Sequence, residues 1–393
     1  MIVGAVAESF PNEKRVALSP AAVKLLKGKG LDVHIESGCG AASGFADDAY
    51  IAQGAKVVAD RKRVFADADL VCQVRTYSAG PRHADADLRL MRAGQCVMGF
   101  CEPLTDARPI EEMARTGARA FAVELMPRTT RAQSMDALSS QALVAGHRAT
   151  LLGASLLGRM FPLMMTAAGT VPAAHVLVIG AGVAGLSAVS TARRLGAVVS
   201  GYDIRPAVKQ EVESLGAKFL MLDLPTHNAQ DRGGYARAMD DSFYKAQREL
   251  MAHAVAHSDV VITTAAVPGK RSPVLITGEM VAKMPRGSVI VDLAAERGGN
   301  CELTQADRTI EAHGVTVAGP TNIVSEAAGS ASLMYARNLA AFVLHMVKDG
   351  AVRPVQGDEI LTDTLLTDGG RIVQPRVREI LGLDGGEKAG SQT

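Results

Sequence analysis

The feature that most constrains the fold is an apolar run that leads straight into a glycine-rich turn. The run is Val176–Ile179, and the turn is Gly180-Ala-Gly-Val-Ala-Gly185. A helix-like segment follows and ends at Leu195-Gly196, and a second apolar run then leads to Asp203. A buried strand, a glycine turn, a helix and a second strand in this order are typical of a doubly wound parallel sheet that binds a dinucleotide. The turn therefore predicts an α/β domain in the second half of the chain.

Each glycine of the turn has a separate physical role in this interpretation. Gly180 permits the tight turn, Gly182 lets the backbone approach a pyrophosphate, and Gly185 lets the helix pack close to the sheet. The unpaired amides at the start of the helix then face the phosphates. A glycine turn that holds no ligand is the alternative.

The acidic residue after the second strand predicts which nucleotide is bound. Asp203 stands at the place, about 20 residues beyond the glycines, where a carboxylate accepts hydrogen bonds from the adenosine ribose hydroxyls. A carboxylate there also repels a 2′-phosphate, which favours NAD over NADP. Arg205 is close by, and a nearby arginine is how such sites accommodate NADP. NADP binding is therefore the alternative to NAD binding.

Six apolar runs after Pro172 predict the strands of this domain. Helix-like stretches separate them, and six alternating strands complete a doubly wound sheet. The predicted strands are Val176–Ile179, Val198–Gly201, Lys218–Leu220, Val260–Thr263, Val289–Asp292 and Val315–Ala318.

The N-terminal region of the chain alternates in the same way. Ser19-Pro20 predicts a capped helix start, and the helix is expected to run through Leu26 and to end at Gly28. Short apolar runs predict the buried strands of a smaller parallel sheet. They are Ile2–Val6, Val33–Ile35, Leu70–Val74, Cys96–Phe100 and Ala120–Val123.

Two long helices are expected to join the domains. One runs from Met135 to about Arg159, and the last helix, roughly Ser325–Val347, is expected to carry the chain back onto the first domain. We therefore predict two Rossmann-like parallel-sheet domains separated by a cleft and joined by long helices. The expected divisions are residues 1–136 for the first domain, 137–327 for the NAD-binding domain with its connecting helix, and 328–393 for the returning helix and a flexible tail.

The composition excludes several classes of function. Lys+Arg 42 against Asp+Glu 41 leaves a net charge of +1, which is not the charge of a protein that grips nucleic acid by its phosphates. The five cysteines are scattered without a histidine cluster, which favours reduced thiols over a metal site. The apolar stretches Ala149–Leu157 and Met160–Ala174 each fall short of the ~20 residues that a membrane span needs. We therefore expect no nucleic acid, no metal and no membrane span.

A polar segment, Arg128–Ser140, is the second candidate site. It precedes the connecting helix and is expected to enter the cleft between the domains, where ligands of two-domain α/β proteins lie. Gln133, Asp136 and Ser140 stand at i, i+3 and i+7, so they share one face if the segment is helical. A capped, solvated helix start explains the same composition equally well.

Other candidates are weaker. Lys14-Arg15 is either a cationic anchor for a ligand or a solvated surface pair. Gly298-Gly299-Asn300 and Pro320-Thr321-Asn322 follow the fifth and sixth strands, where such sheets bind ligands, although ordinary turns have the same composition. Gly233-Gly234-Tyr235 lies in a polar insertion that is long enough to be a mobile flap. No Ser/His/Asp triad or P-loop is recognisable, and none of the nine histidines stands where an alcohol or amine dehydrogenase needs its acid or base.

Several of these runs together resemble the alanine dehydrogenase/transhydrogenase family. Within it, they are most similar to the NAD(H)-binding alpha subunit (domain I) of proton-translocating NAD(P) transhydrogenases. The resemblance covers nearly the whole chain. It is carried by Arg15-Val-Ala-Leu-Ser-Pro20, Val123–Arg128, Arg131–Asp136, Met164–Pro172, Gly180–Gly185, Val267–Lys270, Pro273–Ile276 and Glu296–Asn300.

Alanine dehydrogenases share the fold and the opening arginine but differ at two strands. They have a lysine in the strand ending near Val74 and a catalytic histidine in the strand ending near Phe100, where this sequence has Gln73 and Phe100-Cys101. Hydride transfer between two nicotinamides needs no such proton-handling group, so the resemblance favours the transhydrogenases. Many of them keep a histidine near position 100, and Phe100 departs from that pattern. An alanine dehydrogenase-like amino-acid dehydrogenase and an NAD-sensing module without chemistry are the alternatives.

The resemblance also implies roles for individual residues. Arg128, Gln133 and Asp136 would act at the nicotinamide end, with Gln133 reaching toward the partner nucleotide. Tyr235 would lie at the tip of a mobile loop that closes over NAD(H). The residues implied to contact the cofactor are Arg128, Thr129, Thr130, Gln133, Ser139, Gly180, Gly182, Val183, Gly185, Asp203, Ile204, Arg205, Gly234, Tyr235, Gln247 and Ala266.

The partners and location are likewise implied by the resemblance. The family forms homodimers and works with an NADP(H)-binding subunit and a membrane-embedded proton-channel subunit. NAD(H) is then the nucleotide of this chain, and NADP(H) is held by the partner. The expected location is cytoplasmic and peripheral, on the inner face of the cell membrane.

Overall fold

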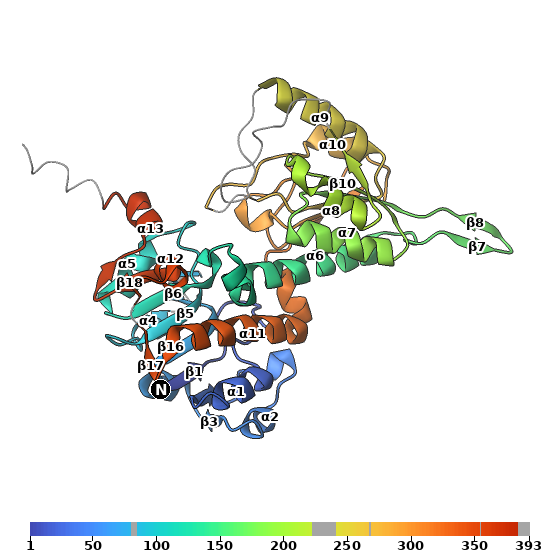
Figure 1. Ribbon diagram of the computed structural model, residues 1–393. Coiled ribbons are helices and arrows are strands. Elements are labelled where there is room, and N and C mark those ends of the chain that lie inside the picture. Colours follow the sequence, from blue (N-terminus) through green and yellow to red (C-terminus); the bar gives the residue numbers. More distant parts are fainter. Residues whose placement is uncertain (80–84, 222–240, 267–268, 354, 384–393) are drawn as a thin grey trace, which may run out of the picture. The chain divides into compact units, whose positions relative to one another are not determined.

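The computed structural model describes residues 1–79, 85–221, 241–266, 269–353 and 355–383 (Figure 1). The predicted tail at 384–393 lies outside them. The chain forms two compact units, each described here by itself. Unit 1 comprises Met1–Gln141 and Ser325–Thr393, and unit 2 comprises Ala142–Val324.

Unit 1 is built on an eight-stranded sheet of order β19-β18-β6-β5-β4-β1-β2-β3. The pairs from β6 to β3 are parallel, whereas β18 and β19 join in antiparallel orientation. The five predicted strands are confirmed within one or two residues, and three short strands escaped prediction because two to four residues carry too little pattern. The strands are β1 Ile2–Ala5, β2 Asp32–Glu36, β3 Lys56–Val58, β4 Leu70–Arg75, β5 Cys96–Phe100, β6 Arg119–Ala122, β18 Leu365–Asp368 and β19 Arg371–Ile372.

Helices cover both faces of this sheet because side chains alternate along each strand. Leu70 and Cys72 of β4 lie in a core with α1 and α11, whereas Val71 lies in a second core with α3 and α5. Ser19 caps α1 as predicted, since its Oγ accepts a hydrogen bond from the Ala22 amide. The helices are α1 Pro20–Lys27, α2 Asp47–Ile51, α3 Arg61–Asp67, α4 Asp85–Leu88, α5 Arg108–Arg115, α11 Ala328–Met346, α12 Glu359–Thr364 and α13 Pro375–Ile380.

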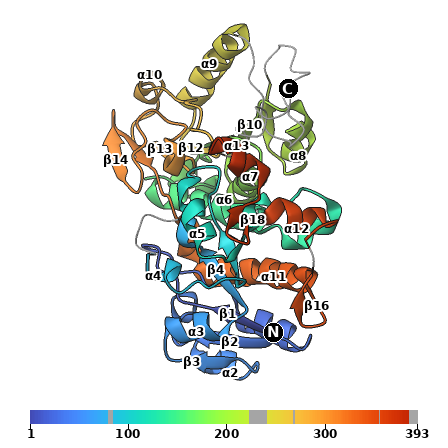
Figure 2. The same ribbon diagram turned by 90° about the vertical axis from the view of Figure 1, so that its left-hand side faces the viewer.

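The last predicted helix needs a correction. A 3-10 turn occupies Ile323–Ala327, so α11 begins only at Ala328, and α12 and α13 follow it. Both views place α11 and α12 beside the N-terminal elements of unit 1 (Figures 1 and 2). The C-terminal segment therefore completes the first sheet, through β18 and β19, as well as its helical layer.

Unit 2 is a doubly wound sheet of order β11-β10-β9-β12-β13-β15-β14. All six predicted strands are present and parallel, in the order third, second, first, fourth, fifth and sixth along the chain. The unpredicted β14 is a half-exposed antiparallel edge strand. The strands are β9 His175–Ile179, β10 Val198–Tyr202, β11 Lys218–Leu220, β12 Val260–Thr263, β13 Val289–Asp292, β14 Thr309–Ala312 and β15 Val315–Ala318.

Two helical layers sandwich this second sheet. Val176 and Val178 pack in one core with α6 and α7, and Leu177 and Ile179 pack in the other with α9 and α10. The predicted connecting helix is α6, whose first residues belong to unit 1. The helices are α6 Ala137–Leu156, α7 Val183–Arg194, α8 Lys209–Ser214, α9 Asp241–Ala256 and α10 Gly278–Ala282.

A β-hairpin replaces the apolar stretch after α6. It consists of β7 Met164–Thr166 and β8 Gly169–Val171, and all six residues are exposed. The hairpin extends away from the seven-stranded sheet (Figure 1). Apolarity in Met160–Ala174 thus reflects an exposed ribbon and not a buried element.

Candidate nucleotide site

The glycine turn of unit 2 has the geometry that its sequence predicts. Gly180 has a φ of 95°, a left-handed conformation that favours glycine. A Cβ on Gly185 would lie 1.8 Å from the carbonyl oxygen of Gly180, so the start of α7 approaches the turn too closely for any side chain. A Cβ on Gly182 would meet no atom within 4 Å. The turn therefore leaves open space at Gly182, the position where backbone approach to a phosphate was predicted.

The start of α7 supplies donors for an anion. Gly182 is the N-cap residue, and its carbonyl oxygen accepts the Leu186 amide at 2.8 Å. The amides of the first turn have no acceptor within the helix, and the helix dipole adds partial positive charge there. Val183, the first helical residue, is 41% exposed. A pyrophosphate fits this end of the helix by charge and by space.

The carboxylate of Asp203 lies beside this turn but is already hydrogen-bonded. It accepts the Ala181 amide at 2.8 Å and the Arg205 amide at 2.8 Å. The Arg205 guanidinium also binds both carboxylate oxygens, with Nε and Nη2 at 2.9 and 2.8 Å. The Asp203 side chain is only 6% exposed. Arg205, which the sequence offered as a ligand for a 2′-phosphate, thus neutralises Asp203 in this structure, with Ile204 between them.

The remaining predicted residues of unit 2 differ in accessibility. Ala266, just beyond β12, is exposed. Gln247 on α9 is buried, and its Nε2 donates to the Tyr202 hydroxyl at 2.9 Å. Gly234 and Tyr235 lie outside the described residues.

The polar segment of unit 1 is not one continuous helix. Thr130–Met135 forms a 3-10 helix, and Asp136 leaves the helical conformation with a ψ of 85° before α6 begins. The predicted common face of Gln133, Asp136 and Ser140 is therefore wrong, because the helix is interrupted between them. Buried Ala132 anchors the 3-10 helix and leaves Gln133 exposed.

Asp136 caps the connecting helix. Its carboxylate accepts the Ser139 amide at 2.9 Å and the Ser139 hydroxyl at 2.6 Å. Arg128 and Thr130 are exposed, and Thr129 is half-buried. The structure thus gathers these predicted residues on one short segment, whose exposed members are Arg128, Thr130 and Gln133.

Arg15 is neither a solvated residue nor a cation open to a ligand. It is 5% exposed, and its guanidinium donates to both oxygens of Glu13 at 2.7 and 2.6 Å and to Gln141 at 3.0 Å. Burial alone would raise the pKa of Glu13, but hydrogen bonds and the charge of Arg15 outweigh it and lower that pKa to about 2. Apart from the closeness of two opposite charges, no sequence signal indicates this pairing. Arg15 is thus held by an internal carboxylate.

The strand ends near residues 73 and 100 are likewise occupied by internal contacts. The Gln73 amide donates to Asp87 at 2.8 Å, and the Phe100 ring stacks on Tyr335 with centroids 5.4 Å apart. The Tyr335 hydroxyl donates to the Gln73 carbonyl at 2.9 Å. These contacts close the edge of the first sheet where an amino-acid dehydrogenase would need reactive side chains.

Glu124 completes this closed edge and makes it sensitive to pH. Its Oε1 accepts the amides of Cys101 and Glu102 at 2.8 and 2.6 Å, while Oε2 is shielded from solvent without a hydrogen-bond partner among the described residues. Burial, with a smaller contribution from the Glu102 carboxylate, raises the pKa of Glu124 to about 7. The protonated carboxyl is therefore the form that the fold favours.

We expect unit 1 to lose stability as the pH rises. The pKa of Glu124 is raised on folding, so its contribution is complete below the unfolded value of 4.5 and is lost as the pH approaches 7. The expected loss between about pH 5 and pH 7 is ~2 kcal/mol. Glu124→Gln keeps the Oε1 acceptor and removes the proton, so its urea denaturation should lack this slope. An equal slope in both proteins would contradict the assignment.

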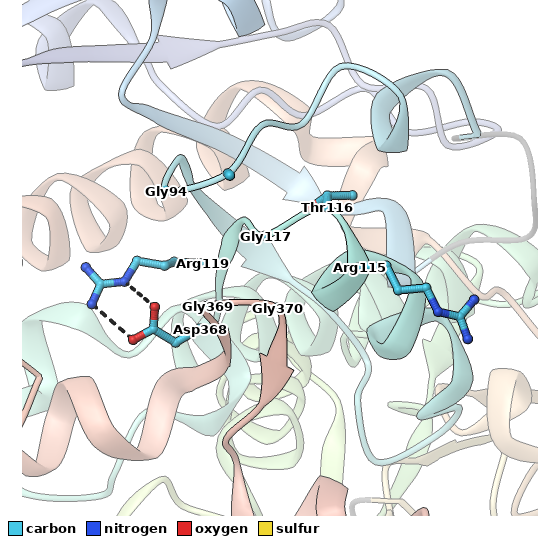
Figure 3. Close-up of a pocket in the computed structure, with 9 residues that line it drawn as sticks. Gly94, Arg115, Thr116, Gly117, Arg119, Asp368, Gly369 and Gly370 are labelled. Atoms are coloured by element: carbon cyan, nitrogen blue, oxygen red, sulfur yellow. Dashed lines mark hydrogen bonds and ion pairs between the residues drawn. The ribbon is translucent and has the colours of Figure 1, made fainter.

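A separate cavity of about 620 Å³ lies at the opposite, amino-terminal edge of the first sheet (Figure 3). Arg119 is paired there with Asp368 at 2.9 Å, and Arg115 points away from that pair (Figure 3). Because its charged groups do not converge, this cavity is not the candidate nucleotide site.

The predictions about metals and membranes concern the whole chain, and the structure bears only on the described residues. There, no three His, Cys, Asp or Glu residues are grouped to hold a metal ion. The five cysteines are buried, and burial raises the pKa of each thiol. Among the same residues, no helix has both the length and the apolarity required to cross a bilayer.

Comparison with known proteins assigns the chain to a family. Residues 4–145 match the family model "Alanine dehydrogenase/PNT, N-terminal domain", and residues 149–375 match "Alanine dehydrogenase/PNT, C-terminal domain". The chain is 45% identical over 371 residues to an NAD(P) transhydrogenase alpha subunit of Rhodospirillum rubrum, covering 94% of this chain and 96% of that protein. It is 29% identical to alanine dehydrogenase of Bacillus subtilis, covering 98% and 96%.

A solved structure agrees with these sequence matches. The transhydrogenase of Sinorhizobium meliloti superposes with a TM-score of 0.81 at 44% identity, covering 95% of this chain and 99% of that one. The predicted pair of Rossmann-like domains and the predicted resemblance are both confirmed. The chain therefore belongs to the alanine dehydrogenase/PNT family, whose members bind nicotinamide nucleotides, and within it to the NAD(P) transhydrogenase alpha subunits.

Proposed function

We propose that this chain is the NAD(H)-binding alpha subunit of a proton-translocating NAD(P) transhydrogenase. Hydride passes directly between its NADH and an NADP⁺ held by a partner subunit. The observation that carries the proposal is the Gly180–Gly185 turn at the start of α7 with Asp203 beside it. The paired state of Arg15 adds support, because it leaves no open cation to anchor an amino acid there.

In this proposal the side chains bind and orient, and NAD(H) supplies the hydride when bound. Gly182 and Val183 approach the pyrophosphate, and Asp203 accepts the ribose hydroxyls after its pair with Arg205 loosens. Gly180, Gly185, Ile204, Gly234, Tyr235, Gln247 and Ala266 complete this region of the site. Arg128, Thr129, Thr130, Gln133, Asp136 and Ser139 contact the nicotinamide end. No acid or base is required because no proton leaves a reacting carbon.

We further propose the assembly that the family resemblance implies. The chain forms a homodimer, and the exposed hairpin with its apolar Met164, Met165 and Val171 supports this because such surface is usually covered. It works with an NADP(H)-binding subunit and a membrane-embedded proton channel. The complex places it on the cytoplasmic side, at the inner face of the cell membrane.

Calorimetry with NADH and NADPH tests the nucleotide assignment. We expect wild-type protein to bind NADH and scarcely to bind NADPH, because the carboxylate of Asp203 repels a 2′-phosphate. Asp203→Ala should weaken NADH binding by ~1–3 kcal/mol, the cost of a lost charge-assisted hydrogen bond. Asp368→Ala, which removes a similar arginine partner in unit 1, is the matched control and should bind NADH normally. Equal affinity of the wild type for both nucleotides would refute the assignment.

A further inference from the structure

The loop that follows β12 is tied to the glycine turn of the nucleotide site. The Thr264 amide donates to the Ile179 carbonyl at 2.8 Å, and the Thr264 hydroxyl donates to the Gly180 carbonyl at 3.0 Å. These bonds fix the first residue of the loop beside the turn. The next residues, Ala265 and Ala266, belong to neither a strand nor a helix, so their position needs other support.

That support comes from Asn300, a side chain that is 0% exposed. Its Oδ1 accepts the Ala265 amide at 3.0 Å, and its Nδ2 donates to the carbonyls of Ala265 and Pro273, each at 2.8 Å. One side-chain amide thus pairs with both backbone groups of Ala265, as a neighbouring strand would. Neither aspartate nor alanine offers both a donor and an acceptor in this space.

Asn300 is held in turn by the buried carboxylate of Asp292. Asp292 Oδ2 accepts the Asn300 amide at 2.7 Å and the Thr304 hydroxyl at 2.7 Å, while Oδ1 accepts the Thr263 hydroxyl at 2.8 Å. Asp292 is also 0% exposed. A buried carboxylate with this many donors is rigid because each bond restrains the others. The network therefore connects the ends of β12 and β13 to the loop.

Strand order places this loop on the side of the site away from Asp203. Asp203 follows β10, which pairs with one edge of β9, whereas the loop follows β12, which pairs with the other edge. A dinucleotide with its adenosine ribose at Asp203 and its pyrophosphate at the β9–α7 turn extends its other half toward β12. The loop at Ala265 and Ala266 then faces the nicotinamide half.

We propose that Asn300, fixed by Asp292, is a positioning residue that holds Ala265 and Ala266 as a rigid wall for the nicotinamide half of the bound dinucleotide. The proposal rests on the proposed NAD(H) function of unit 2. Asn300 itself does not touch the nucleotide, because it acts through the backbone of Ala265.

The test compares NADH with AMP, a probe that spans only the adenosine half, by calorimetry on the full chain. In Asn300→Asp the side chain keeps its size but loses its donors and faces two carbonyl oxygens. We expect the Kd for NADH to rise about tenfold or more, which corresponds to ~1.4 kcal/mol, and the Kd for AMP to stay within about twofold. Gln95→Glu is the matched control, since Gln95 is a buried amide of unit 1 that donates to two backbone carbonyls. It should leave both affinities unchanged.

The outcomes separate this proposal from the proposed function. If the wild type does not bind NADH, the function of unit 2 is wrong. If the wild type binds NADH but Asn300→Asp binds it equally well, or if NADH and AMP weaken in parallel, Asn300 has no positioning role. Should Asn300→Asp fail to fold, Thr264→Val removes the loop's hydroxyl bond to Gly180 with little change in shape. It should weaken NADH about threefold and leave AMP unchanged, and equal weakening of both would again overturn the proposal.

Discussion

The purified protein alone should bind NADH yet reduce free NADP⁺ at least ~100-fold more slowly than it does after the NADP-binding partner subunit is added. The reason is orientation: a partner that delivers the second nicotinamide converts a random encounter into a positioned one, which is worth large factors in rate. Stopped-flow absorbance of NADH oxidation, with and without the partner, measures the ratio. Alanine and pyruvate should support no turnover, since Arg15 is bound to Glu13 and Gln141.

Isotope transfer sharpens this prediction. With deuterium at the reactive C4 position of NADH, the label should appear quantitatively on the product NADPH, because a direct transfer between two carbons gives no exchange with water. Mass spectrometry of NADPH formed in ordinary water measures it. Loss of the label to solvent, or full activity without any partner, would show that another mechanism operates.

Gln133→Asn should slow hydride transfer at saturating NADH by ~100-fold while weakening NADH binding only slightly. Gln133 is exposed on a 3-10 helix that Ala132 and Met135 anchor, so a shorter side chain shifts its amide without disturbing the backbone. A misplacement of about 1 Å can cost ~100-fold in rate, whereas most of the affinity should come from the phosphates and the adenosine. Single-turnover rates and calorimetric affinities on the same preparation separate the two effects.

Two further variants bracket this result. Ser134→Ala changes the neighbouring side chain of the same 3-10 helix and should leave rate and affinity unchanged. Arg128, at the start of the polar segment, should behave like Gln133 when replaced by lysine. If rate and affinity fell by one common factor in Gln133→Asn, the residue would only bind NADH and its assigned role in transfer would be wrong.

The features of this protein that follow from local sequence were predictable. Gly180, Gly182 and Gly185 specify their turn by the conformations and close approaches that only glycine allows. The parallel strands of unit 2 are buried on both faces, so each appears as a short apolar run with the period of its fold. Shorter edge strands such as β14 and β19 lack that signal because few of their residues are buried.

The pairing of polar groups was decided only by the tertiary structure. The sequence shows Arg15 as a charge near the surface, but the fold buries it against Glu13 and Gln141, the latter 126 positions away. It shows Asn300 as a turn residue, but the fold closes it on Ala265. Local patterns determine where strands and turns form, because backbone preferences and hydrophobic periodicity act over a few residues. Partners for buried charges and amides are chosen by which chain segments the sheets bring together, and the desolvation of each group makes that choice binding.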